Sequence, residues 1–276
     1  MTRRKFYSSL LGTSAAFTGY AHFLEPNWLQ VTRPTIKLAL PEPIRILQLS
    51  DLHRSTAVPL RLIESAIDLG LRDDYQPDLI CVTGDFITGP LEREVEYSRA
   101  LARLAKTAPT YAVMGNHDGG AWVQEQGGYA DHSAVDKLLE NSGIHILHNR
   151  AERITIRNTS IWLAGVGDLW SGEVDAKATF ADIETSTGKV ILLAHNPDTK
   201  DVLSHQRWDL MLSGHTHGAQ VIIPFDGPRF APVIDKRYVA GLGQWGSRQI
   251  HVSRGVGNLF GVRFGCRPEV NLLEIV

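Results

Sequence analysis

Five short polar blocks, each directly after an apolar run, constrain the fold of this chain more than any other feature. Short apolar runs bounded by turn residues predict buried strands, and these runs cover residues 44–49, 79–82, 111–114, 190–193 and 210–212. The polar blocks that follow them are Asp51-Leu52-His53, Gly84-Asp85, Gly115-Asn116-His117-Asp118, Ala194-His195-Asn196 and Gly214-His215-Thr216-His217. Because open α/β sheets bind ligands at the carboxyl ends of their strands, this order predicts one rim where carboxylates, imidazoles and an amide meet. That donor set suits divalent metals of hard to borderline character.

The segments between these runs predict two sheets with helices outside them. Residues 59–72 have apolar positions at helical spacing, and residues 92–106 also read as a helix, so the chain begins β–α–β–α–β. That order is typical of a parallel sheet flanked by helices. Further strands are expected at 144–147, 153–156, 161–165 and 271–276, and the first three, with no helix between them, predict a mixed second sheet. Between the two regions we expect a Gly-rich loop over the site, at 119–131 with Trp122, and a helix at 133–141.

Composition places the chain among ordinary globular proteins. It has 276 residues, of which 43% are hydrophobic and 21% charged, which is ample for a real core. The formal net charge of −2 argues against a nucleic-acid-binding protein, which usually has a basic face. Among the arginines late in the chain, we expect Arg254 to clamp a substrate phosphate, whereas Arg248 and Arg263 are expected on a solvated face. The two cysteines have no partners at metal-ligand spacing.

The amino terminus differs in character from the rest of the chain. A basic start, Arg3-Arg4-Lys5, precedes residues 6–24, which contain no Asp, Glu, Lys or Arg. This pattern resembles a twin-arginine export signal, and an ordinary amphipathic helix is the alternative. We therefore predict three parts: a signal or membrane-anchor segment at 1–24, a proline-containing connecting arm at 25–43, and one folded domain at 44–276.

Spacing within the blocks assigns the predicted ligands to two metals. Two metals about 3.5–4 Å apart can clamp both the attacking and the leaving oxygen of a phosphoryl transfer, and such a pair needs a bridging carboxylate. Asp85, which follows Gly84 at a strand tip, is the expected bridge. Residues two apart on extended chain point the same way, so Asp51 and His53 are expected to bind the first metal with His217. The second metal is expected to be bound by Asn116, His195 and His215.

The order Asp-x-His, Gly-Asp, Gly-Asn-His-Asp, His, Gly-His-x-His resembles the calcineurin-like metallophosphoesterase family, from Asp51 to His217. The resemblance implies an α/β fold with a four-layer αββα sandwich over residues 44–276, two mixed sheets flanked by helices. It also implies two divalent metal ions (Mn, Fe or Zn) and a bridging hydroxide as nucleophile. His117 would then be catalytic and not a ligand, protonating the leaving alkoxide or stabilising the phosphoryl oxygens. Asp118 is expected to hold His117 or a ligand in place, with a surface or capping position as the alternative.

The segment 253–269 resembles a bacterial subgroup of small phosphodiesterases, some of which cleave the pyrophosphate of UDP-2,3-diacylglucosamine in lipid A synthesis. The expected reaction is hydrolysis of a phosphodiester or pyrophosphate bond, with a lipid-linked nucleotide as a candidate substrate. Two apolar segments, 222–225 and 230–233, are expected at a membrane surface, and packing on their own core is the alternative. Neither nucleic acid nor an obligate protein partner is expected. The expected location is membrane-associated or exported to the periplasmic side, with the cytoplasmic face of the inner membrane as the alternative.

Two other kinds of function stay open. A phosphomonoesterase or nuclease would use the same metals, although the missing basic stripe disfavours a nuclease. A non-catalytic metal-binding scaffold on the same fold is disfavoured because His117 and all seven ligand positions are present. The histidines outside the blocks are expected mostly at surface or strand positions, with His251 as a candidate for the border of the site; they are His22, His132, His145, His148, His205 and His251.

Overall fold

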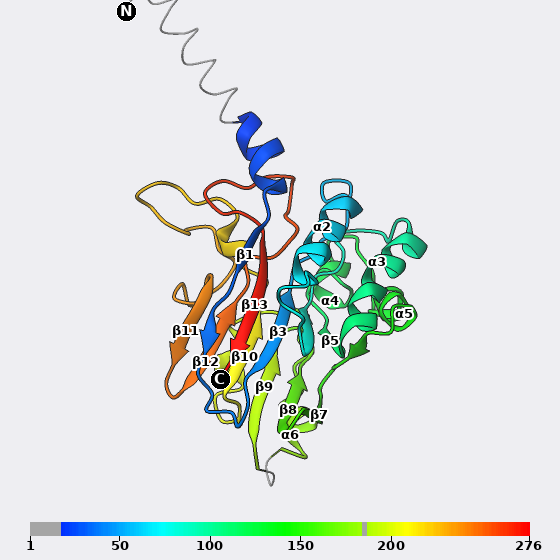
Figure 1. Ribbon diagram of the computed structural model, residues 1–276. Helices are drawn as coiled ribbons and strands as arrows, with labels where there is room; N and C mark the ends of the chain where they lie inside the picture. The colour runs from blue at the N-terminus through cyan, green and yellow to red at the C-terminus, as the bar shows by residue number, and fades with distance from the viewer. Residues whose placement is uncertain (1–17, 184–186) are drawn as a thin grey trace, which may run out of the picture.

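The computed structural model describes residues 18–183 and 187–276, which form two β-sheets with helices on their outer sides (Figure 1). Residues 1–17, the larger part of the expected signal or anchor segment, lie outside the described residues. Within the described ranges, every helix falls short of the length and apolar character that crossing a membrane requires.

The first sheet contains the three strands that were expected to be parallel neighbours. Its order is β1-β13-β3-β4-β5-β6, with β2 also paired to β13. β3, β4, β5 and β6 are mutually parallel, whereas β13 runs antiparallel to β3. The strands are β1 (Gln30–Thr32), β2 (Thr35–Ile36), β3 (Ile44–Leu49), β4 (Leu79–Thr83), β5 (Thr110–Val113), β6 (His145–Ile146) and β13 (Glu269–Ile275).

The expected connecting arm at 25–43 contributes to this sheet. β1 and β2 both pair in parallel with β13, so the segment expected as a connecting arm also adds two short strands to the sheet. The β-branched residues around Pro34 form two short strands, and the proline separates them because it cannot donate to a ladder. Residues 20–24, which the sequence placed in the signal segment, form a short π-helix, η1 (Tyr20–Leu24), followed by the 3₁₀ turn η2 (Glu25–Asn27).

The second sheet is mixed, as predicted. Its order is β11-β12-β10-β9-β8-β7, in which the four inner strands are parallel and the two edge strands antiparallel to their neighbours. The strands are β7 (Arg150–Ile156), β8 (Thr159–Gly165), β9 (Lys189–Leu193), β10 (Leu210–Ser213), β11 (Gly241–Trp245) and β12 (Arg248–Val252).

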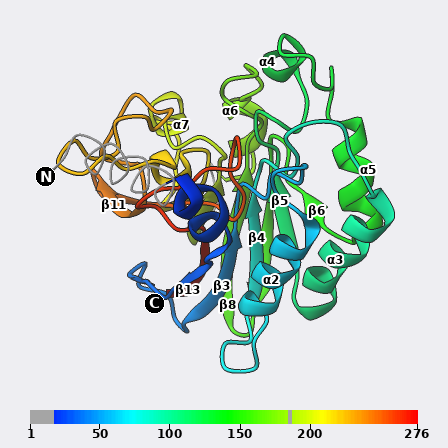
Figure 2. The same ribbon diagram turned by 90° about the horizontal axis from the view of Figure 1, so that it is seen from above.

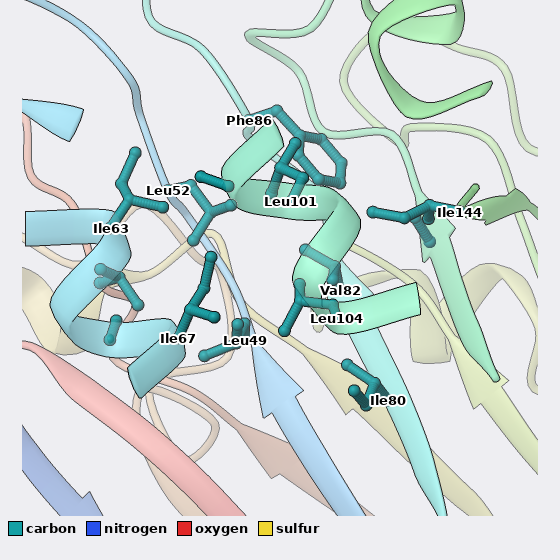
Figure 3. Packing of buried hydrophobic residues seen from close by; sticks show 14 of the residues in the cluster. Leu49, Leu52, Ile63, Ile67, Ile80, Val82, Phe86, Leu101, Leu104 and Ile144 are labelled. Atoms are coloured by element: carbon teal, nitrogen blue, oxygen red, sulfur yellow. The ribbon is translucent and has the colours of Figure 1, made fainter. Parts of the chain in front are cut away.

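Helices cover the outer face of each sheet. α2 (Leu60–Gly70), α3 (Glu94–Thr107) and α5 (Ser133–Asn141) lie along the first sheet (Figure 2), close to the ranges that the sequence predicted. Their apolar residues pack on β3, β4 and β5 in one buried cluster, part of which Figure 3 shows around Phe86 and Leu101. On the second sheet, Phe180 of α6 (Ala176–Phe180) and Leu203, just after α7 (Thr199–Val202), pack on strand residues such as Leu192. The remaining short helices are α4 (Ala121–Gln124) and η3 (His217–Ala219).

A third apolar cluster fills the space between the two sheets. It combines Ile46, Leu79 and Val113 of the first sheet with Leu163, Ile191 and Leu212 of the second. With helices outside both sheets, the molecule has the four-layer αββα arrangement that was expected. Because the strands of both sheets that precede the polar blocks end at the same rim, these layers decide where the site lies.

Candidate metal centre

All seven predicted ligand residues lie just beyond strand ends at one rim of the two sheets. Four of these residues follow β3, β4 and β5 of the first sheet, and the other three follow β9 and β10 of the second sheet. None is more than 5% exposed; the residues are Asp51, His53, Asp85, Asn116, His195, His215 and His217. The fold therefore removes from solvent a set of carboxylates and imidazoles that no apolar packing can satisfy.

The residues expected at the first metal lie within one coordination sphere. One ligand atom from each of Asp51, His53, Asp85 and His217 falls within 4.8 Å of the others. His53 Nε2 is 3.0 Å from His217 Nε2 and 3.2 Å from Asp85 Oδ2, and His217 Nε2 is 3.5 Å from Asp51 Oδ1. Two imidazole nitrogens that face each other so closely need a shared proton or a cation between them. A divalent ion fits this donor set.

The residues expected at the second metal adjoin the first group through Asp85. Asp85 Oδ2 is also 3.2 Å from His195 Nε2, and His195 Nε2 is 3.3 Å from His215 Nδ1. Within the described part of the chain, Asn116 Oδ1 is buried without a hydrogen-bond partner. A buried amide oxygen without a partner is costly, so its position beside Asp85 also fits a cation. Asp85 thus lies between the two groups, where a bridging carboxylate belongs.

Five of the seven residues adopt a left-handed backbone that non-glycine residues rarely use. The φ angles are 50° at Asp51, 47° at His53, 56° at Asp85, 68° at His215 and 50° at His217. Such conformations cost of order 1–3 kcal/mol each and gather at functional sites. The turn at each strand end directs the side chain into the common centre and not along the sheet. The strained backbone therefore occurs at the residues whose side chains converge.

Close packing of two glycines allows these turns. A Cβ on Gly115 would lie 2.2 Å from Asp85 Oδ1, and one on Gly214 would lie 1.8 Å from Ser50 Oγ. Neither position has room for a side chain, which accounts for the glycine that precedes the ligand residue in these two blocks.

Hydrogen bonds orient three of the imidazoles. The His195 ring lies with Nδ1 2.7 Å from the Thr83 carbonyl oxygen, and the His215 ring lies with Nε2 3.1 Å from the Pro232 carbonyl oxygen. A carbonyl accepts only from an N–H, so His195 Nδ1 and His215 Nε2 carry protons. In the neutral rings, His195 Nε2 and His215 Nδ1 direct lone pairs at the centre, where a cation would take the place of a second proton. His53 Nδ1 contacts Thr88 Oγ1 at 2.8 Å, which leaves its Nε2 directed inward.

The electrostatics of the centre match a cation site. Burial opposes ionisation of Asp85, but His195, His117 and His53 hold its pKa well below the usual range. Burial lowers the pKa of His195, but the charge of Asp85 raises it more, to about 10. Burial, together with the charge of His195, lowers the pKa of His215 to about 3. The carboxylate at the centre therefore stays charged and draws positive charge toward itself.

His117 stands apart from the ligand set and faces the open side of the centre. Its backbone N–H donates to Asp85 Oδ1 at 2.9 Å, and its ring packs edge-on against His53 and Trp122, with centroid distances of 5.0 Å to each. Its ring nitrogens have no hydrogen-bond partner among residues 18–183 and 187–276. Burial lowers the pKa of His117 to about 4, so the ring is neutral at pH 7. A bound phosphate anion would raise that pKa.

Asp118 holds the backbone around Asp85 and not the His117 ring. Its Oδ2 accepts from the N–H groups of Asp85 (2.9 Å) and Gly115 (2.8 Å), and its Oδ1 accepts from Phe86 (2.7 Å) and Ile87 (3.3 Å). Burial and the Asp85 charge raise the pKa of Asp118 to about 7, although the backbone N–H groups favour its charged form. Of the expected alternatives, the structure supports the one in which Asp118 positions a ligand residue. It excludes a surface position, because Asp118 is fully buried.

The expectation of a solvated position was wrong for Arg263, and Arg254 makes contacts that the sequence did not predict. The Arg254 side chain, expected to clamp a phosphate, does not line the cavity described below; its Nε donates to Glu269 Oε2 at 3.1 Å and its Nη2 to Gln30 Oε1 at 3.2 Å. Arg263, expected on a solvated face, is fully buried and donates to backbone carbonyls, including those of Gly255, Gly257 and Cys266. Sequence patterns do not reveal backbone carbonyl groups that can accept from a buried guanidinium, so they predict that a charged residue in a loop is exposed.

His251 lies beneath the site instead of at its border. It is buried in β12, and its Nδ1 contacts Gln48 Oε1 at 2.8 Å. Gln48 in turn donates to the Ser213 carbonyl oxygen at 2.9 Å, so this polar pair joins the two sheets under the rim.

A cavity of about 780 Å³ opens next to the centre and is mostly apolar. Asp85, Asn116, His117, His215 and His217 form its polar end. The rest is lined mostly by apolar side chains, among them Val221, Phe230, Leu259 and Phe260, together with Thr88, Gln126 and Gln220. This volume lies in the range of small-molecule sites. The loop with Trp122 does lie over the site, as predicted.

Trp170 completes the wall of the cavity and was not expected. Its ring packs edge-on against His215 at 4.3 Å and lies 5.2 Å from the Trp122 ring, both between centroids. No periodic pattern marks a tryptophan in a loop after a strand, so this contact could not be predicted from the sequence.

Asp168 was also missed, although a signal existed. Like Asp85, it follows a glycine, Gly167, just beyond a strand of the rim. It is buried, its Oδ2 accepts from the Ser171 N–H at 2.7 Å, and its Oδ1 has no partner in the described part of the chain. Burial raises the pKa of Asp168, and the positive charge of His195 opposes that rise.

Known proteins share this sequence pattern. The pattern of the calcineurin-like phosphoesterase family matches residues 44–219. The phosphodiesterase YaeI of Escherichia coli (strain K12) is 41% identical to this chain over 283 residues, and the match spans 100% of both chains. The uncharacterized metallophosphoesterase YkuE of Bacillus subtilis (strain 168) is 32% identical over 100% of this chain and 98% of its own. The UDP-2,3-diacylglucosamine pyrophosphatase LpxG of Chlamydia trachomatis is 27% identical over 92% of each chain.

Proposed function

The chain belongs to the calcineurin-like phosphoesterase family and is a metal-dependent hydrolase of phosphate esters, and from that premise we propose that it is a phosphodiesterase for an amphiphilic substrate. The bond would be a phosphodiester or a pyrophosphate that joins a polar group to a lipid or another apolar group. The observation that carries this proposal is the cavity, in which the polar end with Asp85 and His117 continues into an apolar wall.

Two divalent metal ions would be bound around Asp85. Asp51, His53 and His217 would hold the first, and Asn116, His195 and His215 the second, with Asp85 between them. When bound, the ions would supply positive charge to the phosphoryl oxygens and would make a nucleophilic hydroxide available at neutral pH. The mixed oxygen and imidazole donors suit Mn, Fe or Zn.

His117 would act on the leaving group. Its ring borders both the centre and the cavity, and its nitrogens have no other partner among the described residues. The ring is neutral at pH 7 because burial lowers its pKa to about 4. A neutral ring donates one N–H to a phosphoryl or leaving oxygen, and the negative charge of a bound diester favours the protonated ring that can deliver a proton.

A comparison of three substrates tests the proposed reaction. The full chain, in mild detergent with Mn²⁺, would be given an artificial phosphodiester, a phosphomonoester and UDP-2,3-diacylglucosamine side by side. We expect the lipid nucleotide to be cleaved fastest, to UMP and a lipid phosphate. If the phosphomonoester were turned over fastest, the protein would be a phosphomonoesterase and the proposal would be wrong.

Substitution at His117 and Asp85 tests the assigned roles. We expect His117→Ala to retain its metals and to lose about 10²–10⁴-fold in turnover of diesters with poor leaving groups. Asp85→Asn should lose metal itself. The control is His145→Ala, because His145 is an exposed residue of β6 outside the centre. Full activity of His117→Ala on an alkyl phosphodiester would contradict the role of this histidine.

The mouth of the cavity would lie against a lipid bilayer. Phe230 and Phe260 line the cavity and are 62% and 88% exposed, and Phe225, on the loop before Phe230, is fully exposed. The η1 helix adjoins the same end, since the Arg263 N–H donates to the Ala21 carbonyl oxygen at 3.0 Å. η1 closes the uncharged stretch of residues 6–24, and its Phe23 is 76% exposed. Exposed apolar groups gathered at one end favour a membrane surface as the partner.

Vesicle sedimentation tests this contact. We expect the full chain with Phe225→Ser and Phe260→Ser together to bind phospholipid vesicles more weakly than the unmodified chain. Val95→Ser is the matched control, because Val95 is also an exposed apolar residue (69%) but lies on α3. Equal binding by the unmodified and the doubly substituted chain would show that these loops do not contact the bilayer.

A further inference from the structure

Three potential metal ligands meet outside the catalytic centre. His132 directly precedes α5, His148 lies between β6 and β7, and Glu173 lies in the loop after β8. One ligand atom from each falls within 4.8 Å of the others. His132 Nε2 is 2.8 Å from Glu173 Oε2, and the His132 and His148 rings are 5.8 Å apart between centroids.

We propose that His132, His148 and Glu173 bind one transition-metal ion of the Zn²⁺ type, and that this ion fastens together the two loops that carry the tryptophans of the active-site wall. Two imidazoles and a carboxylate form a donor set of borderline softness that suits Zn²⁺. His148 is exposed, so a water molecule can complete a tetrahedral site. No residue is shared with the group around Asp51 and Asp85.

The backbone around these ligands is already held in place. Asn149, next to His148, accepts from the N–H groups of Gly167 and Asp175 at 3.0 Å each through Oδ1, and its Nδ2 donates to the Glu173 carbonyl oxygen at 2.7 Å. These bonds fix the loop with Glu173 against the turn with His148. A site whose ligands are already positioned loses little entropy when it takes up an ion.

The ion pair with Glu173 involves only one nitrogen of the His132 ring, Nε2. The His132 side chain is 12% exposed, and its Nδ1 is buried without a partner in the described part of the chain. Burial lowers the pKa of His132, but its contacts with Glu173 raise the pKa overall. A metal on Nε2 would take the place of the proton that now joins this nitrogen to Glu173.

The same two loops form the wall of the catalytic cavity. His132 ends the loop that contains Trp122, and Glu173 follows Trp170 by three residues. The loops pack tightly on each other, since a Cβ on Gly120 would lie 2.7 Å from Glu173 Oε1. Trp122 and Trp170 contact each other at 5.2 Å between ring centroids. An ion that holds His132 to Glu173 therefore fixes the spacing of the two tryptophans.

Zn²⁺ titration of the full chain, with its catalytic centre first saturated with Mn²⁺, tests the proposal. Bound Zn²⁺ and retained Mn²⁺ would be counted by mass spectrometry after desalting, so that exchange at the catalytic centre is recognised as loss of Mn²⁺. We expect one Zn²⁺ per chain beyond any that replaces Mn²⁺, and at least about tenfold weaker binding of this ion in His148→Ala. His145→Ala is the matched control, because His145 is also an exposed histidine, three residues away, and should bind Zn²⁺ like the unmodified chain.

Two further readouts complete the experiment. Because His148 is exposed, His148→Ala is expected to fold and to keep its turnover of a small artificial diester, and Glu173→Gln provides a second variant that should also lose the added Zn²⁺. Tryptophan emission should change when the added Zn²⁺ binds to the unmodified chain, and not in His148→Ala. Equal Zn²⁺ binding by the unmodified chain and His148→Ala would overturn the site. Binding without a change in emission would overturn the link to the tryptophan wall.

Discussion

Replacing Asp118 by asparagine separates the organising role of this residue from any direct part in catalysis. The carboxylate accepts four backbone N–H groups, from Asp85, Gly115, Phe86 and Ile87. An amide of the same shape keeps one oxygen and turns an NH₂ group toward two of these donors. Two buried N–H groups are thereby left without an acceptor.

The expected loss of stability follows from that count. Each buried unsatisfied group costs about 1–3 kcal/mol, so two cost about 2–6 kcal/mol. Burial also opposes the charge of the carboxylate, as its raised pKa shows, and the amide is free of that cost. We therefore expect a loss in the lower part of this range, about 2–4 kcal/mol in the free energy of unfolding. Because Asp118 holds the Asp85 backbone, Mn²⁺ affinity should also fall by about 10–100-fold.

Urea unfolding of the full chain, followed by tryptophan fluorescence with and without EDTA, measures this loss from the midpoint at constant m value. Asp131→Asn is the matched control, because Asp131 is exposed and accepts a single backbone bond, from Ser133 at 2.9 Å. Asparagine serves nearly as well as aspartate at such a position, so the control should stay within about 0.5 kcal/mol. A loss below about 1 kcal/mol for Asp118→Asn would refute the reasoning.

Three further predictions concern other parts of the site. In the presence of EDTA, His53→Gly should be more stable to urea than His53→Ala by about 1 kcal/mol, because φ is 47° there; equal stability would mean that the left-handed backbone is unstrained. Arg254→Gln should lower turnover far less than the roughly 100-fold expected for a lost phosphate clamp, and a 100-fold loss in kinetic assays would restore the clamp. Contacts with Glu173 raise the pKa of His132 from 6.5, and His132 lowers that of Glu173 from 4.5. The stability that His132 contributes is lost as pH rises through its folded pKa, and the stability that Glu173 contributes is lost as pH falls through its folded pKa. The thermal stability lost in Glu173→Gln should therefore be greatest between pH 4.5 and 6.5, and a loss that does not vary with pH would contradict the ion pair.

The sequence predicted the parts of the fold and site that depend on repeated local patterns. The strands before the five blocks, the two sheets and the helices over the first sheet all follow from apolar runs and periodicity. The convergence of Asp51, Asp85 and His195 follows from a general rule about strand ends and not from any local feature. A glycine precedes the predicted ligand residue in three of the five blocks, and the same sign at Gly167 would have drawn attention to Asp168.

The remaining features depend on contacts that local patterns do not encode. Strands as short as β1 and β2 have too few residues to show a period, so the sequence of residues 25–43 predicts only a connecting arm. The burial of Arg263 depends on the way its own loop folds around the guanidinium, with the Gly255 and Gly257 carbonyl groups as acceptors. Trp170 reaches the cavity because two loops meet above the rim, and that meeting is set by tertiary packing.

Contacts between parts of the chain that are far apart in sequence determine when the centre can be assembled. Gln48 pairs with Asn271, about 220 residues later in the chain, and contacts of such sequence separation form slowly because a long loop must close first. The backbone N–H of His215 likewise reaches Asp51 across 164 residues. A growing chain that has emerged only to Asn116 carries Asp51, Asp85 and Asn116 but lacks three of the four predicted imidazole ligands. We therefore expect divalent metal to bind late in folding, so that the metals present in the compartment where folding is completed would decide which of them the site takes up.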